Sequence, residues 1–268
     1  GQGDMSDVIR NFDRNAGHGN LLKLRQLSED FYPKTRQTSR QALVHRLAIR
    51  FSRGMSKPRY TDLVASLPAT VPFVGPETQE RAMGRPFAAR LGANENIFGP
   101  SPKAIAAMAD AAQEIWMYGD PENHDLRHAL AAFHKVSPDN IVVGEGIDGL
   151  LGYLVRLLIG QGDAVVTSLG AYPTFNYHVA GFGGTLHTVP YLNDHEDLPA
   201  LIAKARETRA KLIYFANPDN PMGTWQQGAD IAAQLDQIPD GCLLVLDEAY
   251  VELAPSGTEA IYDVEHPK

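Results

Sequence analysis

The feature of this sequence that most constrains its fold is a regular alternation of short apolar runs with amphipathic stretches between residues 101 and 247. The apolar runs, which are typical of strands, occupy residues 141–143, 164–169, 185–191, 212–216 and 243–247. The helical patterns start at Ser101 and near Thr174, and also cover residues 124–135, 147–159, 198–209 and 229–237. This alternation predicts an α/β fold in which helices sandwich a mostly parallel sheet.

Charge and proline content divide the chain into three predicted regions. Residues 1–54 hold 10 Lys and Arg against 5 Asp and Glu, whereas the rest of the chain holds 14 against 27. One interpretation of this basic extension is that it is not native and that Met55 is the true start. Residues 55–100 carry prolines at positions 58, 68, 72, 76 and 86, which predicts an extended N-terminal arm. Residues 101–268 form the third region.

Composition limits the partners. The net charge of −8 is concentrated in the acidic body, which argues against nucleic acid as the main partner. No apolar run approaches the roughly 20 residues that span a bilayer, so no membrane partner is expected. The single cysteine, Cys242, adjoins an apolar strand and is most simply a packed thiol in a reducing, cytoplasmic compartment.

The run of apolar residues 243–246 leads directly into Asp247. A run with this many apolar residues predicts a strand that is buried on both faces. Ligands of open α/β sheets bind at the carboxyl edge, where such strands end. A carboxylate there is costly to desolvate unless a cation meets it. The structural alternative is a cap or an ion pair with a neighbouring loop.

Two further motifs are expected at the same edge. Residues 144–149 fit G-x-G-x-x-G, but the next strand ends without the carboxylate that a dinucleotide ribose needs, so a phosphate site or a simple tight turn is favoured over NAD. Residues 217–224 form an irregular loop with two Asn-Pro pairs that presents the amide of Asn220. Their convergence with Asp247 indicates one ligand site.

Two other patterns have weaker functional interpretations. The aromatic side chains of residues 172–177 follow a strand and either stack on a flat ligand or pack in the core. His124 and His128 are four residues apart, as in zinc proteases, with Asp125 in the place of the usual glutamate. A third ligand is not evident, so we expect no metal and interpret the pair as a solvated first helical turn.

Together these motifs resemble the fold-type I pyridoxal-phosphate aminotransferases of class I/II, in the histidinol-phosphate aminotransferase branch. The resemblance covers about residues 90–250, and the order and spacing of the motifs make it specific. It implies that residues 55–100 are the arm and the start of a small domain, and that residues 101–268 are an incomplete large domain that binds pyridoxal 5'-phosphate. The motifs are residues 93–96, 118, 146–148, 173–175, 217–223 and 247–250.

The resemblance implies roles for the residues around the cofactor ring. Asp247 would pair with the protonated pyridine nitrogen, so that the ring can accept electrons. Asn220 and Tyr250 would hold the phenolic oxygen, and Phe175 would stack on the ring.

The remaining implied roles concern the cofactor phosphate and the substrate. The backbone of Gly146, Ile147 and Asp148 would meet the phosphate. Tyr118 would reach the phosphate of the cofactor in the partner subunit of a homodimer. Asn94 and Glu95 would lie near the substrate entrance.

The sequence departs from the family in one replacement and one absence. Met222 stands where threonine is common, and the loop-forming Asn, Pro and Gly around it are kept. The Schiff-base lysine that relatives carry about 30 residues after their Asp-Glu-Ala-Tyr motif has no counterpart, because Lys268 lies only 21 residues after Asp247. We therefore expect a C-terminally truncated chain without a catalytic residue that does not transaminate by itself.

The intact protein is expected to transfer an amino group between an amino acid or amino alcohol phosphate and a 2-oxo acid. Two alternatives remain open. The first is a pyridoxal-phosphate-dependent amino-acid-phosphate decarboxylase, which would share the cofactor site. The second is a non-catalytic, aminotransferase-like sensor domain behind a basic DNA-binding segment, although residues 1–54 show no clear helix-turn-helix pattern.

Overall fold

The structure is a computed structural model that describes residues 59–68 and 74–259. The chain divides into two units, residues 1–59 and 60–268, and all the elements described below belong to the second unit. The basic extension and the proposed start at Met55 lie outside the described residues. No helix in the described part of the chain is long and apolar enough to cross a membrane.

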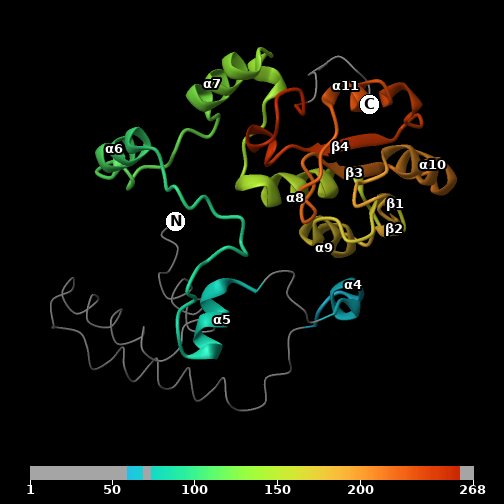
Figure 1. Ribbon diagram of the computed structural model, residues 1–268, viewed down its shortest axis with the longest axis horizontal. Coiled ribbons are helices and arrows are strands. Elements are labelled where there is room, and N and C mark those ends of the chain that lie inside the picture. The colour runs from blue at the N-terminus through green and yellow to red at the C-terminus, as the bar shows by residue number, and fades with distance from the viewer. Residues whose placement is uncertain (1–58, 69–73, 260–268) are drawn as a thin grey trace. The chain divides into compact units, whose positions relative to one another are not determined.

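Four parallel strands form the sheet (Figure 1). They are β1 (Ala164–Ser168), β2 (Thr185–Val189), β3 (Leu212–Ala216) and β4 (Leu243–Asp247), in the order β2-β1-β3-β4. The predicted mostly parallel sheet is confirmed. The register of β3 and β4 pairs Ala216 with Asp247, so both strands end at the same level of the carboxyl edge.

Helices cover both faces of this sheet (Figure 1). One face packs on α8 (Gly146–Leu158) and α9 (Pro173–Gly181), and the other on α10 (Leu198–Thr208) and α11 (Gly228–Ala232). Successive side chains of a strand point to opposite faces. Accordingly, Leu212 and Tyr214 belong to the first core, whereas Ile213 and Phe215 belong to the second.

Burial differs between the neighbouring strands β3 and β4. All five residues of β3 are buried, as expected for a strand covered on both faces. In β4 only Asp247 is buried, and the four apolar residues before it are half-buried. The prediction of full burial for β4 is therefore wrong, because β4 lies at the edge of the described sheet and β3 is its only described neighbour.

Three other predicted segments differ from the structure. Residues 141–143 run extended but pair with no described strand, and Val142 is exposed. The predicted helix 229–237 divides into α11 and a 3₁₀ turn, Leu235–Gln237. The arm is not wholly extended, because it forms α4 (Asp62–Ser66) and α5 (Pro76–Met83). Proline is favourable in the first turn of a helix, so Pro76 starts α5 rather than preventing it.

The segment between the arm and the sheet contains two helices, α6 (Pro102–Ala111) and α7 (His124–His134). The Ser101 hydroxyl accepts a hydrogen bond from the Lys103 N–H at the start of α6, as its sequence predicts. A 3₁₀ turn, Pro138–Asn140, then leads toward α8, and another, Val251–Leu253, follows β4.

Candidate active site at the carboxyl edge of the sheet

Asp247 is the buried carboxylate of this edge, with 7% of its surface exposed. Its Oδ2 accepts a hydrogen bond of 2.6 Å from the Tyr214 hydroxyl, and its Oδ1 accepts one of 3.0 Å from the Ala249 N–H. The second contact is the local turn cap that the sequence left open. No lysine, arginine or histidine among the described residues forms an ion pair with Asp247, so its charge is available to a cationic ligand.

Tyr214 fixes the position of the Asp247 side chain through this hydrogen bond. Its ring is fully buried and stacks on Phe175, with ring centres 4.5 Å apart and planes 17° from parallel. Burial, and then the neighbouring charge of Asp247, raise the pKa of Tyr214 far above its ordinary value. The phenol therefore stays protonated and donates to the carboxylate at any physiological pH.

Asp247 also lines a small pocket at the carboxyl edge of the sheet. The pocket gathers residues from the ends of β3 and β4, from the start of α8 and from the loop after β1. The lining residues are Ile147, Tyr172, Ala216, Pro218, Asn220, Asp247, Ala249 and Tyr250. Four of the predicted cofactor residues, Ile147, Asn220, Asp247 and Tyr250, thus lie together.

The structure changes the identity of the aromatic residue that faces the pocket. Phe175 has no exposed surface, because it packs between α8, α9 and the sheet with its ring against Tyr214. Tyr172, three residues earlier, lines the pocket and donates from its hydroxyl to Asp148 Oδ1 at 2.8 Å. The stacking role implied for Phe175 stays a prediction, and Tyr172 is a second candidate for it because Tyr172 lines the pocket.

The start of α8 provides free backbone donors. Gly146 adopts a φ of +70°, and no atom lies within 4 Å of the position that a Cβ would occupy there. No side chain caps this helix. The Glu145 carboxylate accepts a hydrogen bond of 2.7 Å from the Tyr153 hydroxyl, and its Oε2 lies 2.8 Å from the position that a Cβ would occupy at Gly149. The first-turn N–H groups of residues 147 and 148 therefore suit an anion.

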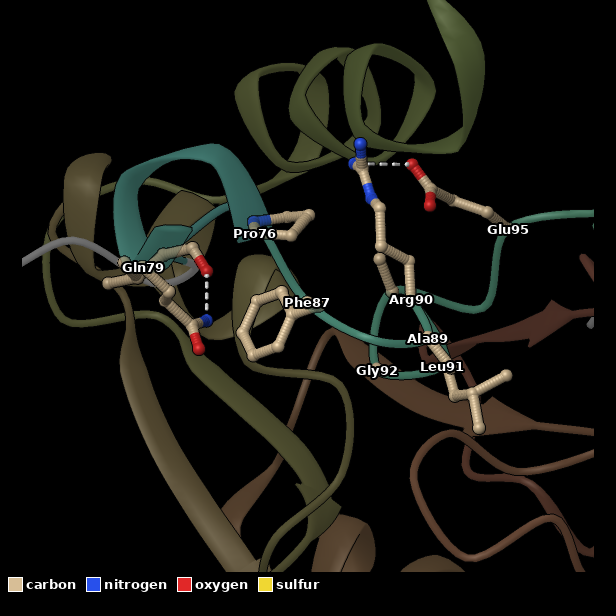
Figure 2. Close-up of a pocket in the computed structure, with 10 residues that line it drawn as sticks. Pro76, Gln79, Phe87, Ala89, Arg90, Leu91, Gly92 and Glu95 are labelled. Carbon is tan, nitrogen blue, oxygen red and sulfur yellow. Dashed lines mark hydrogen bonds and ion pairs between the residues drawn. The ribbon is translucent and has the colours of Figure 1, made fainter. Parts of the chain in front are cut away.

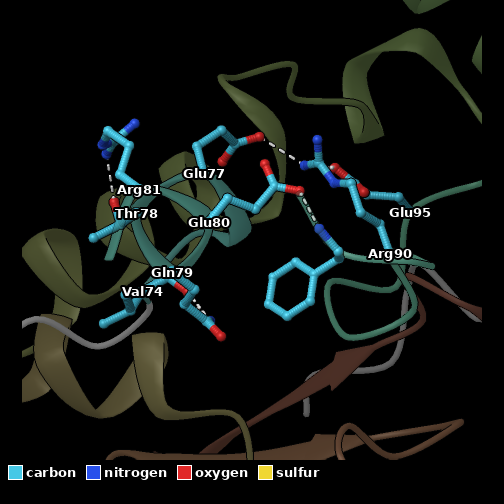
Figure 3. Close-up of polar contacts among 9 residues, drawn as sticks. Val74, Glu77, Thr78, Gln79, Glu80, Arg81, Arg90 and Glu95 are labelled. Carbon is cyan, nitrogen blue, oxygen red and sulfur yellow. Dashed lines mark hydrogen bonds and ion pairs between the residues drawn. The ribbon is translucent and has the colours of Figure 1, made fainter. Parts of the chain in front are cut away.

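The predicted substrate residues lie on the arm and have different surroundings. The Asn94 amide donates to the Tyr250 hydroxyl at 3.3 Å, which links the arm to the pocket. Glu95 forms an ion pair of 3.3 Å with Arg90, which also binds Glu77 at 2.6 Å (Figure 3).

The arm also has a hollow of its own. Residues 74–95 fold around it, and Figure 2 shows Arg90 and Glu95 on its rim, with Phe87 beside Pro76. The Phe87 N–H donates to Glu80 at 3.0 Å (Figure 3). All the residues that line this hollow come from one stretch of the arm, so it is a feature of local folding.

Two predicted patterns are fully solvated. The Tyr118 ring is completely exposed and contacts none of the lining residues in the described structure. His128 Nδ1 hydrogen-bonds to the His124 carbonyl oxygen at 2.8 Å. Among the residues that the structure describes, no group of three or more His, Cys, Asp or Glu side chains could hold a metal ion.

Comparison with known families shows to which family the chain belongs. The sequence model of the family "Aminotransferase class I and II" matches residues 89–266, which include every residue of the pocket. The chain belongs to this family. Membership also accounts for the match between the order of the motifs and the geometry of the sheet edge.

The most informative aminotransferase relatives fall in one branch. A histidinol-phosphate aminotransferase from an Anaeromyxobacter strain is 41% identical over 70% of this chain and 52% of its own length. One from Dinoroseobacter shibae is 37% identical over 62% of this chain and 46% of its own length. The chain thus spans about half the length of the relatives that it matches.

A solved aminotransferase gives the structural comparison. The histidinol-phosphate aminotransferase from Sinorhizobium meliloti, determined in complex with pyridoxal-5'-phosphate, is 55% identical to this chain. The match has a TM-score of 0.73 and covers 76% of this chain and 55% of that one. This comparison confirms the predicted fold of the large domain.

Two residues that matter for the site were missed at first, namely Tyr214 and Tyr172. A tyrosine inside an otherwise apolar buried strand is itself a signal, because its hydroxyl must find a partner. Pairing of Tyr214 with Val245 puts it on the face that Asp247 shares, two residues further along β4. Tyr172 was one of the aromatic residues after the strand of residues 164–169, but its sequence did not distinguish it from Phe175.

Proposed function

We propose that the intact protein is a pyridoxal-phosphate-dependent aminotransferase that transfers the amino group of an amino acid or amino alcohol phosphate to a 2-oxo acid. The observation that carries the proposal is the buried, unpaired Asp247 in a pocket with Asn220 and Tyr250. The similarity to histidinol-phosphate aminotransferases supports the phosphate-bearing substrate.

The residues present fit this cofactor. A pyridinium nitrogen needs an anionic partner, and Asp247 is a carboxylate that accepts hydrogen bonds from the Tyr214 hydroxyl and the Ala249 N–H. A phosphate needs N–H donors without a competing side chain, and the uncapped start of α8 provides them. The open space beside Gly146 lets a ligand approach the backbone closely.

Each residue of the pocket then has a defined role. Pyridoxal phosphate supplies the electron sink when it is bound. Asp247, fixed by Tyr214, holds the proton on the ring nitrogen. The Asn220 amide and the Tyr250 hydroxyl, which line the pocket with Tyr172, would bind the phenolic oxygen, and Tyr172 would stack on the ring.

The start of α8 and the arm complete the proposed site. Gly146, Ile147 and Asp148 bind the phosphate through their backbone. The hydrogen bond from Asn94 to Tyr250 brings the arm to the substrate side, where Glu95 would also act.

The quaternary and cellular assignments belong to the same proposal. Full exposure of Tyr118 suits a role across a homodimer interface, toward the phosphate of the partner subunit's cofactor. A cytoplasmic location fits the buried thiol of Cys242, the single cysteine of the sequence. The decarboxylase and sensor alternatives are not favoured, because the relatives at 34–41% identity are histidinol-phosphate aminotransferases.

Two measurements test the proposal. Titration of the chain with pyridoxal phosphate, followed by absorbance, should show saturable binding that Asp247→Asn weakens about tenfold or more, since a hydrogen bond to a charged group contributes about 1.5–3 kcal/mol. The product of the whole reading frame should transfer the amino group of histidinol phosphate to a 2-oxo acid. Absence of saturable binding in the wild type would refute the proposal.

A further inference from the structure

A second buried carboxyl group lies behind the pocket and has no part in the proposed chemistry. Glu196, in the connection between β2 and α10, is 3% exposed. Its Oε2 accepts a hydrogen bond of 2.5 Å from the Ser168 hydroxyl at the end of β1, and its Oε1 accepts one of 2.8 Å from the Ala216 N–H at the end of β3. Glu196 therefore joins the ends of two neighbouring strands.

The partner of Glu196 on the other side is a second carboxyl group, that of Asp219. Asp219 is 4% exposed and lies in the loop that follows β3. Its Oδ2 accepts from the Tyr191 hydroxyl at 3.0 Å and from the Met222 N–H at 3.1 Å. Its Oδ1 is buried and has no hydrogen-bond partner among the described residues. The Asp219 carboxyl group is close enough to Glu196 for its charge to raise the pKa of Glu196.

Two carboxylates in contact repel each other, and neither has a hydrogen atom to donate. A single proton between them removes both problems, because it halves the charge and supplies the missing donor. We propose that Glu196 and Asp219 share one proton at mildly acidic pH and lose it around neutral pH, and that the protonated pair positions the loop of residues 217–224, with Asn220, at the pocket. The second part of the inference rests on the proposed function.

The groups around the pair favour the protonated form. Burial raises the pKa of Glu196 to about 7, and the nearby charge of Asp219 adds to this increase. Burial also raises the pKa of Asp219. The other titratable groups acting on the pair are the hydroxyls of Tyr191 and Tyr214, which are neutral.

No described cation contacts either carboxyl group of the pair. None of the ion pairs among the described residues includes Glu196 or Asp219. The two residues next to Glu196 in the sequence, His195 and Asp197, form hydrogen bonds with other groups. His195 Nδ1 hydrogen-bonds to the Asn193 carbonyl oxygen, and Asp197 caps α10 through the Ala200 N–H.

The loop is attached to this pair at its centre. The Asp219 carboxylate and backbone bind Met222, Gly223 and Thr224, so the turn closes on Asp219 itself. The residues on either side, Pro218 and Asn220, line the pocket. Loss of the shared proton would therefore release the loop at the point from which Asn220 is presented.

The pair has a definite pH signature. Because its pKa rises on folding, Glu196 gives the native state an extra proton between about pH 4.5, where it titrates when unfolded, and about pH 7. Stability from this group is therefore fully present below the lower limit, falls as the pH rises through the window, and is constant above it.

Infrared spectroscopy of the chain tests the shared proton without any cofactor. The wild type should show a protonated carboxyl band that disappears with a midpoint near pH 7, and Glu196→Gln should lack it, because its amide donates a fixed hydrogen instead. The matched control Glu114→Gln changes an exposed carboxyl group and should retain the band. A wild type without such a band, or a Glu196→Gln variant that keeps it, overturns the inference.

The loop-positioning role needs a second readout. Between about pH 6 and pH 8.5, the affinity of the wild type for pyridoxal phosphate should fall about fivefold relative to that of Glu196→Gln, the effect of one net hydrogen bond. If both proteins change in parallel, the positioning role is wrong. If neither binds, the proposed function fails, while the infrared result still decides the shared proton. Asp219→Asn, which can donate to Glu196, replaces Glu196→Gln if that variant does not fold.

Discussion

The Tyr214 hydroxyl donates to Asp247 Oδ2 at 2.6 Å across two neighbouring strands of the sheet. The tyrosine is fully buried, and its ring stacks on Phe175, so the donor has little freedom to move. The carboxylate that would meet the cofactor nitrogen is thereby fixed from the protein side before any ligand arrives.

We expect Tyr214→Phe to lower the free energy of unfolding by about 1.5–3 kcal/mol, because a buried carboxylate loses a charge-assisted hydrogen bond while the stacked ring remains. The affinity for pyridoxal phosphate should fall as well. Urea denaturation and cofactor titration measure the two effects. Tyr60→Phe is the control, since its side chain is exposed and it does not line the pocket, and a similar loss of cofactor affinity there would contradict the explanation.

The two aromatic candidates for the ring face can be separated. Phe175→Ala should destabilise the fold by about 3–5 kcal/mol, because it leaves a cavity in a closed core. Tyr172→Ala should change stability much less and weaken cofactor binding, since Tyr172 lines the pocket. Thermal denaturation and absorbance titration of both variants provide the comparison. Normal cofactor affinity in Tyr172→Ala would return the stacking role to the original assignment.

Gly146 is expected to be required for its backbone conformation and not for space. Gly146→Ala should lower the free energy of unfolding by about 1–2 kcal/mol, because φ is +70° there although the position of a Cβ is open. Gly146→Asn should cost less, since asparagine adopts this region more readily. Chemical denaturation of both variants measures these costs.

The control for Gly146 is Gly181→Ala in α9, a site with open space and no positive φ. It should leave stability unchanged or raise it, since alanine is the better helix former. Equal losses at the two glycines would show that φ is not the cause.

Asn217 should be needed for the shape of the loop after β3. Its amide donates to the carbonyl oxygens of Gln226 and Thr258 at 3.0 Å each, and its Oδ1 accepts from the Gln226 N–H at 2.8 Å. Asn217→Ala leaves these buried groups unsatisfied, so the free energy of unfolding should fall by about 2–3 kcal/mol. Denaturation with urea, with exposed Asn140→Ala as the control, measures the effect; equal stability of the two variants would contradict it.

Much of the large domain could be predicted from local pattern. The strand of residues 212–216 was predicted with its observed limits, and α8 and α10 within one or two residues. Residues 141–143 show where pattern fails. Their β-branched and apolar character favours a strand, but a ladder needs a neighbour, and none lies beside them in the described sheet.

In the candidate site, too, the sequence could place some residues and not others. Asp247, Asn220 and Ile147 could be placed at one edge because parallel strands present their carboxyl ends together. The choice between Tyr172 and Phe175 could not be made, since the two residues are three positions apart and either could face the sheet edge. Packing distinguishes the two side chains, because the space between α8, α9 and β3 encloses Phe175 and leaves Tyr172 at the pocket, and we therefore propose Tyr172 for the ring face.

The sequence by itself determined the α/β class, the succession of the elements and the carboxylate at the end of β4, because periodicity and strand ends are properties of neighbouring residues. Only the tertiary structure decided which groups meet across the sheet. Tyr214 with Asp247, and Glu196 with Asp219, are brought together by register and burial over separations of 33 and 23 residues. The protonation of such pairs depends on contacts between distant segments, which no local pattern contains.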